Sequence, residues 1–287
     1  MHTPRPARFE PRDLAELKSL RASHPELAPA IDLQAELVDF QRRLQGRIPT
    51  PVVLGTTGEG AVRLAAGHRL LELADLSPDW SDLRLAVRRV ADILRRHEAL
   101  DAGDYTRIVG LTREGGRLET LLADWYAESL PPIDRRTQTA IHRAAFPAIL
   151  DQVLSLGLRP FLTKAAHVAA QGLDLAAWGR PWCPFCGAEP DFAVLTPNGG
   201  RLLTCGRCEG RWPWEPVGCP WCGTLDPGQL VTLASSDGQY RLYACNVCRR
   251  YLKAYDGRGG RRPAMPTVDT IATLPLDAAA MQRGYGV

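Results

Sequence analysis

Eight cysteines occur in four pairs of the form C-x-x-C, and all of them lie between residues 183 and 248. The first two pairs fall in "CPFCGAEPDFAVLTPNGGRLLTCGRC" and the other two in "CPWCGTLDPGQLVTLASSDGQYRLYACNVC". Cysteines separated by two residues turn both sulfurs inward around a tight turn. Two such turns joined by a hairpin place four sulfurs at tetrahedral corners. The spacing therefore predicts two metal sites with four sulfur ligands each.

The two stretches form an internal repeat, because each begins C-P-aromatic-C-G and ends in a second C-x-x-C pair. Eighteen residues separate Cys186 from Cys205, and 22 separate Cys222 from Cys245. Both segments are long enough for a hairpin and close to the spacing of zinc ribbons. Since each repeat contains a complete ligand set, sequential pairing is favoured over a cross-braced arrangement. The predicted sets are Cys183, Cys186, Cys205 and Cys208 for one ion, and Cys219, Cys222, Cys245 and Cys248 for the other.

Four-sulfur ligation suits zinc or a rubredoxin-like iron, and the spacing does not choose between them. With every ligand position filled by a thiolate, no position is open to water. Such a site is structural or electron-transferring rather than hydrolytic. Redox-active dithiols and chance pairs are the competing interpretations, and the fourfold recurrence disfavours both. Gly187 and Gly223 directly follow the leading pairs and supply the backbone freedom that such turns often need.

Composition bounds the class of protein. The chain has 287 residues, 45% hydrophobic content and a net charge of +3, which is typical of a soluble globular protein. So small a charge gives no argument for a nucleic-acid or anionic-membrane partner. The start lacks an apolar segment of the signal-peptide kind, and no uninterrupted apolar run of about 18 residues occurs. We therefore expect no membrane insertion and a cytoplasmic location, where paired cysteines are metal ligands or redox thiols rather than disulfides.

The expected fold is multidomain, with an N-terminal all-helical domain over residues 1–176. Apolar residues recur with helical spacing in four segments, and a shorter helix is expected over 159–172. Core packing is the expected role of these apolar faces. The four segments are 33–44, 83–94 with Ser81 as its cap, 118–126, and 141–156 with a kink at Pro147.

Beyond residue 176, glycine and proline become frequent and helical periodicity ends. The short apolar runs "FAVL", "RLLT", "QLVTL" and "YRLYA" predict strands. We therefore expect two small β modules in tandem, each built around one cysteine set. The first is placed at 177–217, and the second, with the C-terminal segment, at 218–287.

Other candidates for chemistry are weak. "GTTGEG" at 55–60 lacks the Lys-Ser/Thr ending of a phosphate-binding loop, so a flexible loop is the better interpretation. None of the six histidines lies in the cysteine region. The run "DGRGGRRPAM" could touch nucleic acid, but a solvated loop is the commoner meaning of so short a basic cluster. Trp212, Trp214 and Trp221 lie among the cysteine pairs and are expected to shield the sulfurs from water.

The C-terminal motifs resemble one known family, the formate dehydrogenase accessory proteins, FdhE. The resemblance is continuous from about residue 158 and extends before it in helix order only. The segments that carry it are "LRPFLTKAA", "WCPFCGAEP", "CGRCEGRW", "CPWCG", "CNVCRRYLK" and "DTIATLPLDAAAMQRGY". Beside the cysteine pairs, its specific residues are Tyr251, Leu252, Lys253, Asp269, Leu276, Asp277, Gly284 and Tyr285.

The resemblance implies a cytoplasmic, rubredoxin-like metal protein that is not itself an enzyme. Such a protein assists maturation of a molybdenum- or tungsten-dependent formate dehydrogenase, in a chaperone-like manner, by binding its catalytic subunit. The resemblance also implies that all eight cysteines are metal ligands. The chain departs from the family pattern at Arg211, where an acidic residue is expected, at Pro216, where arginine is expected, and at Tyr243, where glutamate is expected. These departures bear on the client more than on the fold.

Two functions from other classes remain as alternatives. A zinc ribbon that binds nucleic acid would use the basic run, although the near-neutral total charge disfavours it. A C-x-x-C thiol redox protein would have low-pKa thiols and no bound metal.

Overall fold

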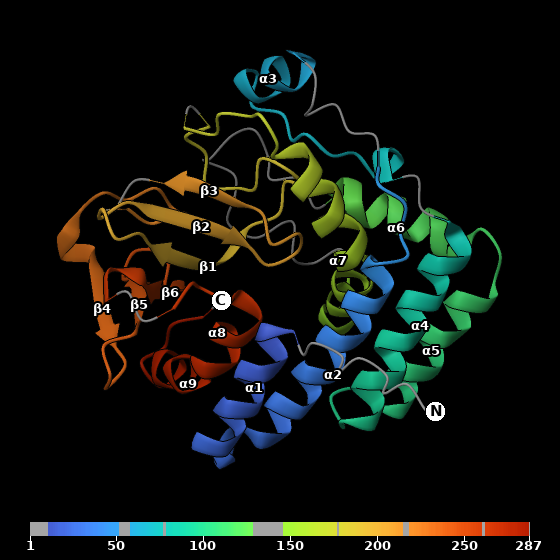
Figure 1. The fold of residues 1–287 in the computed structure, drawn as a ribbon, viewed down its shortest axis with the longest axis horizontal. Coiled ribbons are helices and arrows are strands. Elements are labelled where there is room, and N and C mark those ends of the chain that lie inside the picture. The colour runs from blue at the N-terminus through green and yellow to red at the C-terminus, as the bar shows by residue number, and fades with distance from the viewer. Residues whose placement is uncertain are drawn as a thin grey trace, which may run out of the picture.

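The computed structural model describes residues 11–51, 58–76, 79–128, 146–176, 178–214, 218–259 and 262–286. A helical N-terminal region lies beside a six-stranded sheet, and the C-terminal helices pack beneath that sheet (Figure 1). The α-helices are α1 (Arg12–Ser23), α2 (Ala28–Gln45), α3 (Gly58–Ala65), α4 (Trp80–Arg96), α5 (Ala102–Arg113), α6 (Arg117–Glu128), α7 (Ala148–Ala169), α8 (Pro266–Ala272) and α9 (Leu274–Gln282). Short 3₁₀ turns are η1 (Pro25–Leu27), η3 (Leu73–Leu76), η5 (Pro227–Gln229) and η6 (Gly257–Gly259).

Helix α4 lies at the centre of the helical region and confirms the predicted apolar face. Its four predicted positions, Leu83, Val87, Val90 and Leu94, are all buried. The predicted cap is wrong by two residues: Asp79 is the N-cap, and its carboxylate accepts the Ser81 amide at 2.8 Å. A carboxylate reaches the second helical amide and also carries the charge that the helix N-terminus favours.

Helix α7 corrects two predictions about the segment from 141 to 172. Pro147 does not kink a helix, because the helix begins directly after it, at Ala148. Residues 141–145 of the predicted segment lie outside the described residues. The expected break before the second helix is absent, since α7 continues through Pro160 to Ala169. Proline at 160 has no amide to donate to the Leu156 carbonyl, and the Gln41 side chain of α2 donates to that carbonyl instead, at 2.9 Å.

One sheet contains both cysteine repeats, in the order β3-β2-β1-β6-β5-β4. Each repeat contributes antiparallel pairs, and β1 joins β6 in parallel from Phe192↔Lys253 to Leu195↔Asp256. The predicted strands are confirmed as β1, β2, β4 and β5; the prediction missed β6 and the edge strand β3, where Pro213 is tolerated. The bounds are β1 (Pro190–Leu195), β2 (Arg201–Cys205), β3 (Arg211–Trp214), β4 (Leu230–Ala234), β5 (Tyr240–Cys245) and β6 (Tyr251–Asp256).

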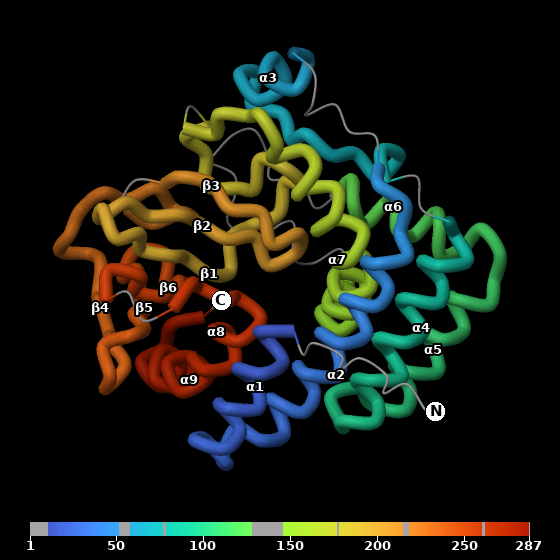
Figure 2. Tube along the Cα trace, in the orientation of Figure 1, coloured from blue at the N-terminus to red at the C-terminus, as the bar shows by residue number. Residues whose placement is uncertain are grey.

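The C-terminal helices return to the N-terminal ones, so segments far apart in sequence lie side by side (Figure 2). Val268 of α8 packs with Leu17 of α1 and Ile31 of α2 in one buried cluster. The Gln34 side chain donates to the Thr267 carbonyl at 3.0 Å. Within the described ranges, no helix combines the length and apolar character needed to cross a membrane.

The hydrogen bond from Gln41 to the Leu156 carbonyl predicts a loss of stability that depends on Pro160. Gln41→Leu leaves the half-buried Leu156 carbonyl without this partner and is expected to lower the free energy of unfolding by about 1 kcal/mol. Urea unfolding followed by far-UV circular dichroism measures it. In a Pro160→Ala background the backbone amide at 160 supplies the missing donor, so Gln41→Leu should cost much less there. Equal costs in both backgrounds would contradict this account.

Candidate metal centres

All four C-x-x-C pairs form the same backbone turn. The amide four residues after each leading cysteine donates to that cysteine's carbonyl at 2.9–3.0 Å. The leading cysteine's own amide donates to the carbonyl five residues later, at 2.8–3.0 Å. The donor of the first bond has a positive φ in every turn: Gly187 at 79°, Glu209 at 58°, Gly223 at 72° and Arg249 at 60°. The predicted role of the two glycines is confirmed, and Glu209 and Arg249 adopt the same conformation without being glycine.

The turns bring the eight sulfurs into two groups. Within each group the sulfur atoms all lie within 4.8 Å of one another. The groups are Cys183, Cys186, Cys205 and Cys208, and Cys219, Cys222, Cys245 and Cys248, which is the sequential arrangement and not the cross-braced one. Four sulfurs about 2.3 Å from a central zinc would be about 3.8 Å apart. The shortest sulfur–sulfur distances are 3.4 Å in the first group and 3.6 Å in the second, so the donor sets could each hold one metal ion.

The first group lies inside the main apolar core, at the junction of the helical region and the sheet. Its four cysteines are at most 1% exposed. The amides of Leu70 and Leu71 donate to the carbonyls of Pro184 and Phe185, both at 2.9 Å, so the helical region binds the first turn through its backbone. The Phe185 ring occupies the space that a Cβ at Gly210 would need. Sequence reasoning missed the hydrogen bonds from Leu70 and Leu71, because nothing in these two residues marks them as partners of a cysteine turn.

Burial sets the electrostatics of the first group. Removal from water raises the pKa of the Cys183 and Cys208 thiols well above their ordinary value. Four thiolates therefore exist here only if a cation offsets their charge, and metal binding must displace protons. The amides of Arg207 and Cys208 donate to the Cys205 sulfur at 3.3 and 3.5 Å. A divalent ion is the cation that four inward-facing sulfurs suit.

A buried arginine lies near the second group. Arg201 is 4% exposed, its guanidinium stacks 5.0 Å from the Tyr243 ring, and it donates to the Gly218 carbonyl at 3.3 Å. Among the described residues no carboxylate pairs with it, and its Nε has no partner. Burial lowers the pKa of Arg201, and attraction to Tyr243 and Cys219 opposes that shift. A tetrathiolate around a divalent ion carries two negative charges and would supply the missing counter-charge.

The family-specific C-terminal residues hold the sheet to the last helices. Lys253 of β6 pairs with Asp277 of α9 at 2.6 Å, and the Tyr251 hydroxyl donates to the same carboxylate at 2.9 Å. The Tyr285 hydroxyl contacts the Asn246 side chain at 2.7 Å, within the last cysteine turn. These residues position the second repeat rather than forming a separate reactive site.

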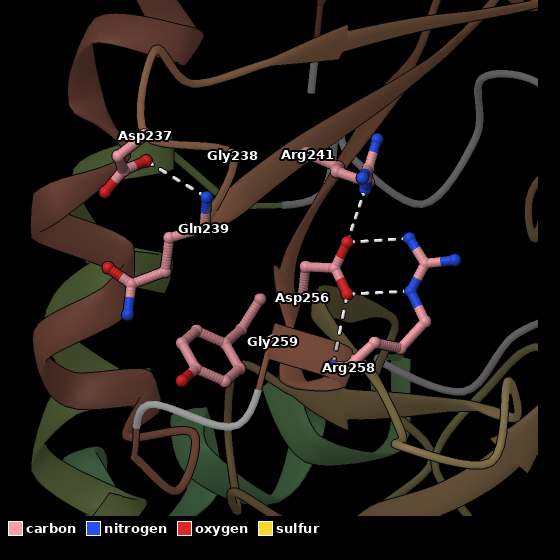
Figure 3. Close-up of a pocket in the computed structure, with 8 residues that line it drawn as sticks. Asp237, Gly238, Gln239, Arg241, Asp256, Arg258 and Gly259 are labelled. Carbon is pink, nitrogen blue, oxygen red and sulfur yellow. Dashed lines mark hydrogen bonds and ion pairs between the residues drawn. The ribbon is translucent and has the colours of Figure 1, made fainter.

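One hollow that no cysteine lines contains an ion-pair cluster (Figure 3). Its volume is about 500 Å³, and Asp256 lies on its wall. That carboxylate accepts from Arg241 Nε at 2.7 Å and from Arg258 Nη2 at 2.6 Å. Hydrogen bonds from Arg258 and then Arg241 hold the pKa of Asp256 well below its usual range. The Asp256 carboxylate is therefore held ionised between two arginines and is not a free general acid or base.

The basic run is used inside the fold. Arg258 pairs with Asp256, and Arg262 pairs with the fully buried Asp269, which also accepts the Tyr240 hydroxyl at 3.0 Å. Arg261 lies outside the described residues. Both described arginines thus have carboxylate partners within the chain, which weakens the case for a nucleic-acid contact.

The other residues singled out from the sequence have structural surroundings. Trp212 is fully buried and donates to the Arg180 carbonyl at 3.0 Å. Trp221 lies under the Arg250 guanidinium at 4.4 Å, beside the second group. In "GTTGEG", residues 58–60 begin helix α3, and 55–57 lie outside the described residues.

The fold and the candidate sites together define the class of protein. A helical region is joined to one sheet, and that sheet holds two four-cysteine groups. No protein-family model matches the chain. It is 27% identical over 285 residues to "Protein FdhE homolog" of Yersinia enterocolitica, covering 96% of this chain and 84% of the relative. A match of 31% over 110 residues to Escherichia coli "Protein FdhE" covers 37% of this chain and 35% of that protein.

A solved structure has the same fold. The crystal structure of the FdhE protein from Pseudomonas aeruginosa aligns with a TM-score of 0.64 and 21% identity, over 96% of this chain and 92% of that chain. The resemblance to FdhE that the C-terminal motifs predicted is confirmed, and it extends through the helical region. The chain is thus similar to proteins named FdhE over nearly its whole length, in sequence and in fold.

The position of Arg201 predicts that its removal weakens metal binding but does not destabilise the metal-free protein. In protein loaded with Zn²⁺, Arg201→Met should weaken binding at the second group about tenfold, which is about 1.4 kcal/mol. In metal-free protein the same change should be neutral or stabilising, because it removes a buried charge that no carboxylate among the described residues offsets. Competition with a chromophoric chelator measures the first effect and urea unfolding the second. Arg283→Met, which removes the same charge from an exposed side chain, is the control; equal effects of the two variants would contradict the prediction.

The ion pairs of Asp256 predict a pH-dependent contribution to stability. Because its pKa is lowered in the folded protein, this contribution is complete above the ordinary carboxyl pKa of about 3.9 and is lost as the pH falls below it. Asp256→Asn should cost about 1 kcal/mol at pH 7, allowing for solvent screening of Arg258, and progressively less below pH of about 4. Urea unfolding of both proteins across this range measures the difference. Asp39→Asn, at an exposed ion pair, is the control, and a cost for Asp256→Asn that does not change with pH would refute the prediction.

Proposed function

We propose that this protein assists maturation of a molybdenum- or tungsten-dependent formate dehydrogenase by binding the enzyme's catalytic subunit. It acts in the cytoplasm, in a chaperone-like role, and catalyses no reaction itself. The observation that carries the proposal is the similarity to proteins named FdhE over 96% of this chain, with both four-cysteine groups inside it. The fold of the FdhE protein from Pseudomonas aeruginosa supports the same assignment.

We further propose that the eight cysteines ligate two metal ions, zinc or iron, in rubredoxin-like modules. The donor sets suit this, because each places four sulfurs around one point with no position left for water. The role of such ions is structural, because metal binding supplies much of the folding free energy of small hairpins. With the first group at the junction of helices and sheet, the ion would fix the relative position of the surfaces that a client meets.

A nucleic-acid-binding zinc ribbon is the weaker candidate. Specific binding of that kind needs basic side chains free to meet phosphates. Arg258 and Arg262 instead have carboxylate partners in the chain. A thiol redox protein is also weaker, because the sulfurs gather in fours rather than in isolated pairs.

The test is capture of the client by the tagged full-length chain in cells that produce a molybdenum- or tungsten-dependent formate dehydrogenase. The wild-type chain should retain the catalytic subunit, identified by mass spectrometry, and Cys183→Ser with Cys245→Ser should lose it together with bound metal. Formate dehydrogenase activity in cells lacking the wild-type gene should fall to background with this double variant. Ser236→Ala, at an exposed position outside both groups, is the control.

Two results would overturn the proposed function. One is retention of the subunit by the double variant at the wild-type level after its metal is lost. The other is capture of nucleic acid instead, with a steep decline as the salt concentration rises.

A further inference from the structure

The chain covers its two four-cysteine groups very differently. In the first group all four cysteines are at most 1% exposed. In the second, Cys219 and Cys245 are 2% exposed, Cys248 is half-buried and Cys222 is exposed. The two repeats have the same C-x-x-C turns, so the difference in exposure comes from what packs on those turns.

The first group is sealed from two sides. Leu70 and Leu71 hold its leading turn from the helical region, and the Arg207 guanidinium of its trailing turn lies 4.2 Å from the Trp125 ring of α6. The group belongs to the same buried cluster as α4 and α7. A competing ligand reaches these sulfurs only when the helical region separates from the sheet, which is an opening of a large part of the core.

The C-terminal tail covers part of the second group. The Gly286 amide donates to the Arg249 carbonyl at 2.8 Å, and the Arg249 guanidinium stacks 4.1 Å from the Tyr285 ring. This tail contacts the trailing turn. On the leading turn the Arg250 guanidinium covers Trp221, Cys219 is buried and Cys222 is exposed. Beside Cys222, the side chains of Leu225 and Val247 are 66% and 57% exposed. Among the described residues, no element packs over this face.

We propose that the second group is an exchangeable metal site and that the first group retains its ion. The inference rests on the metal binding put forward under Proposed function. A soft competing donor, such as a free thiolate, approaches the ion from the Cys222 side. The bond between the metal and the Cys222 sulfur breaks as the new metal–sulfur bond forms. One thiolate replaces another, so charge is conserved and nothing is oxidised or reduced.

The experiment uses the full chain loaded with two equivalents of Zn²⁺ and mixed with an excess of chromophoric chelator. Zinc should leave in two phases of one equivalent each, with rates separated by more than about tenfold, because only the slow phase requires opening of the core. Parallel samples receive iodoacetamide and the chelator together and are digested at intervals. Mass spectrometry should find Cys222 alkylated first and the peptides containing 183–208 last.

Cys222→Ser identifies the phases: it should remove the fast equivalent and leave the slow one at its wild-type rate. The order of alkylation in the unchanged chain gives the same information without any variant. Release of both equivalents at one rate, or alkylation of the first group before the second, would overturn the inference while leaving metal binding intact. Failure of the folded chain to bind zinc at all would instead overturn the proposed metal sites themselves.

Discussion

Closure of the first four-cysteine group is the interaction on which the rest of the structure depends. Its sulfurs are buried where the helical region meets the sheet, and the Leu70 and Leu71 amides bond to the turn between Cys183 and Cys186. Burial makes four thiolates unstable without a cation, so the same packing that hides the sulfurs creates the need for an ion. The packing between the helical region and the sheet and the metal-binding chemistry of the first group therefore depend on each other.

The parallel pairing of β1 with β6 extends that constraint to the second repeat. Two three-stranded units that each carry a cysteine group become one six-stranded sheet, and β6 is buried along its whole length. Lys253 and Tyr251 then connect the sheet to Asp277, and α8 returns to α1 and α2. The second group is therefore attached to the same frame although it lies outside the main core. Its position is fixed while Cys222 stays exposed to solvent.

The arginines near the sheet differ in the same way: some are paired within the fold, and one lies where a metal site could supply its counter-charge. Arg258 and Arg262 are paired with carboxylates inside the fold, so the basic run contributes to packing rather than to a charged surface. Arg201, in contrast, is buried without such a partner among the described residues and lies where the second group can supply negative charge.

The sequence by itself determined the local features: the cysteine turns, their sequential grouping, the glycines at 187 and 223, four of the strands and the apolar face of α4. These features depend on contacts between residues close in sequence, and spacing reports such contacts directly. Only the tertiary structure decided that α7 runs through Pro160 with Gln41 as the replacement donor, and that Leu70 and Leu71 bind the first turn. It also decided that identical repeats have unequal exposure, because burial is set by distant segments that neither repeat encodes.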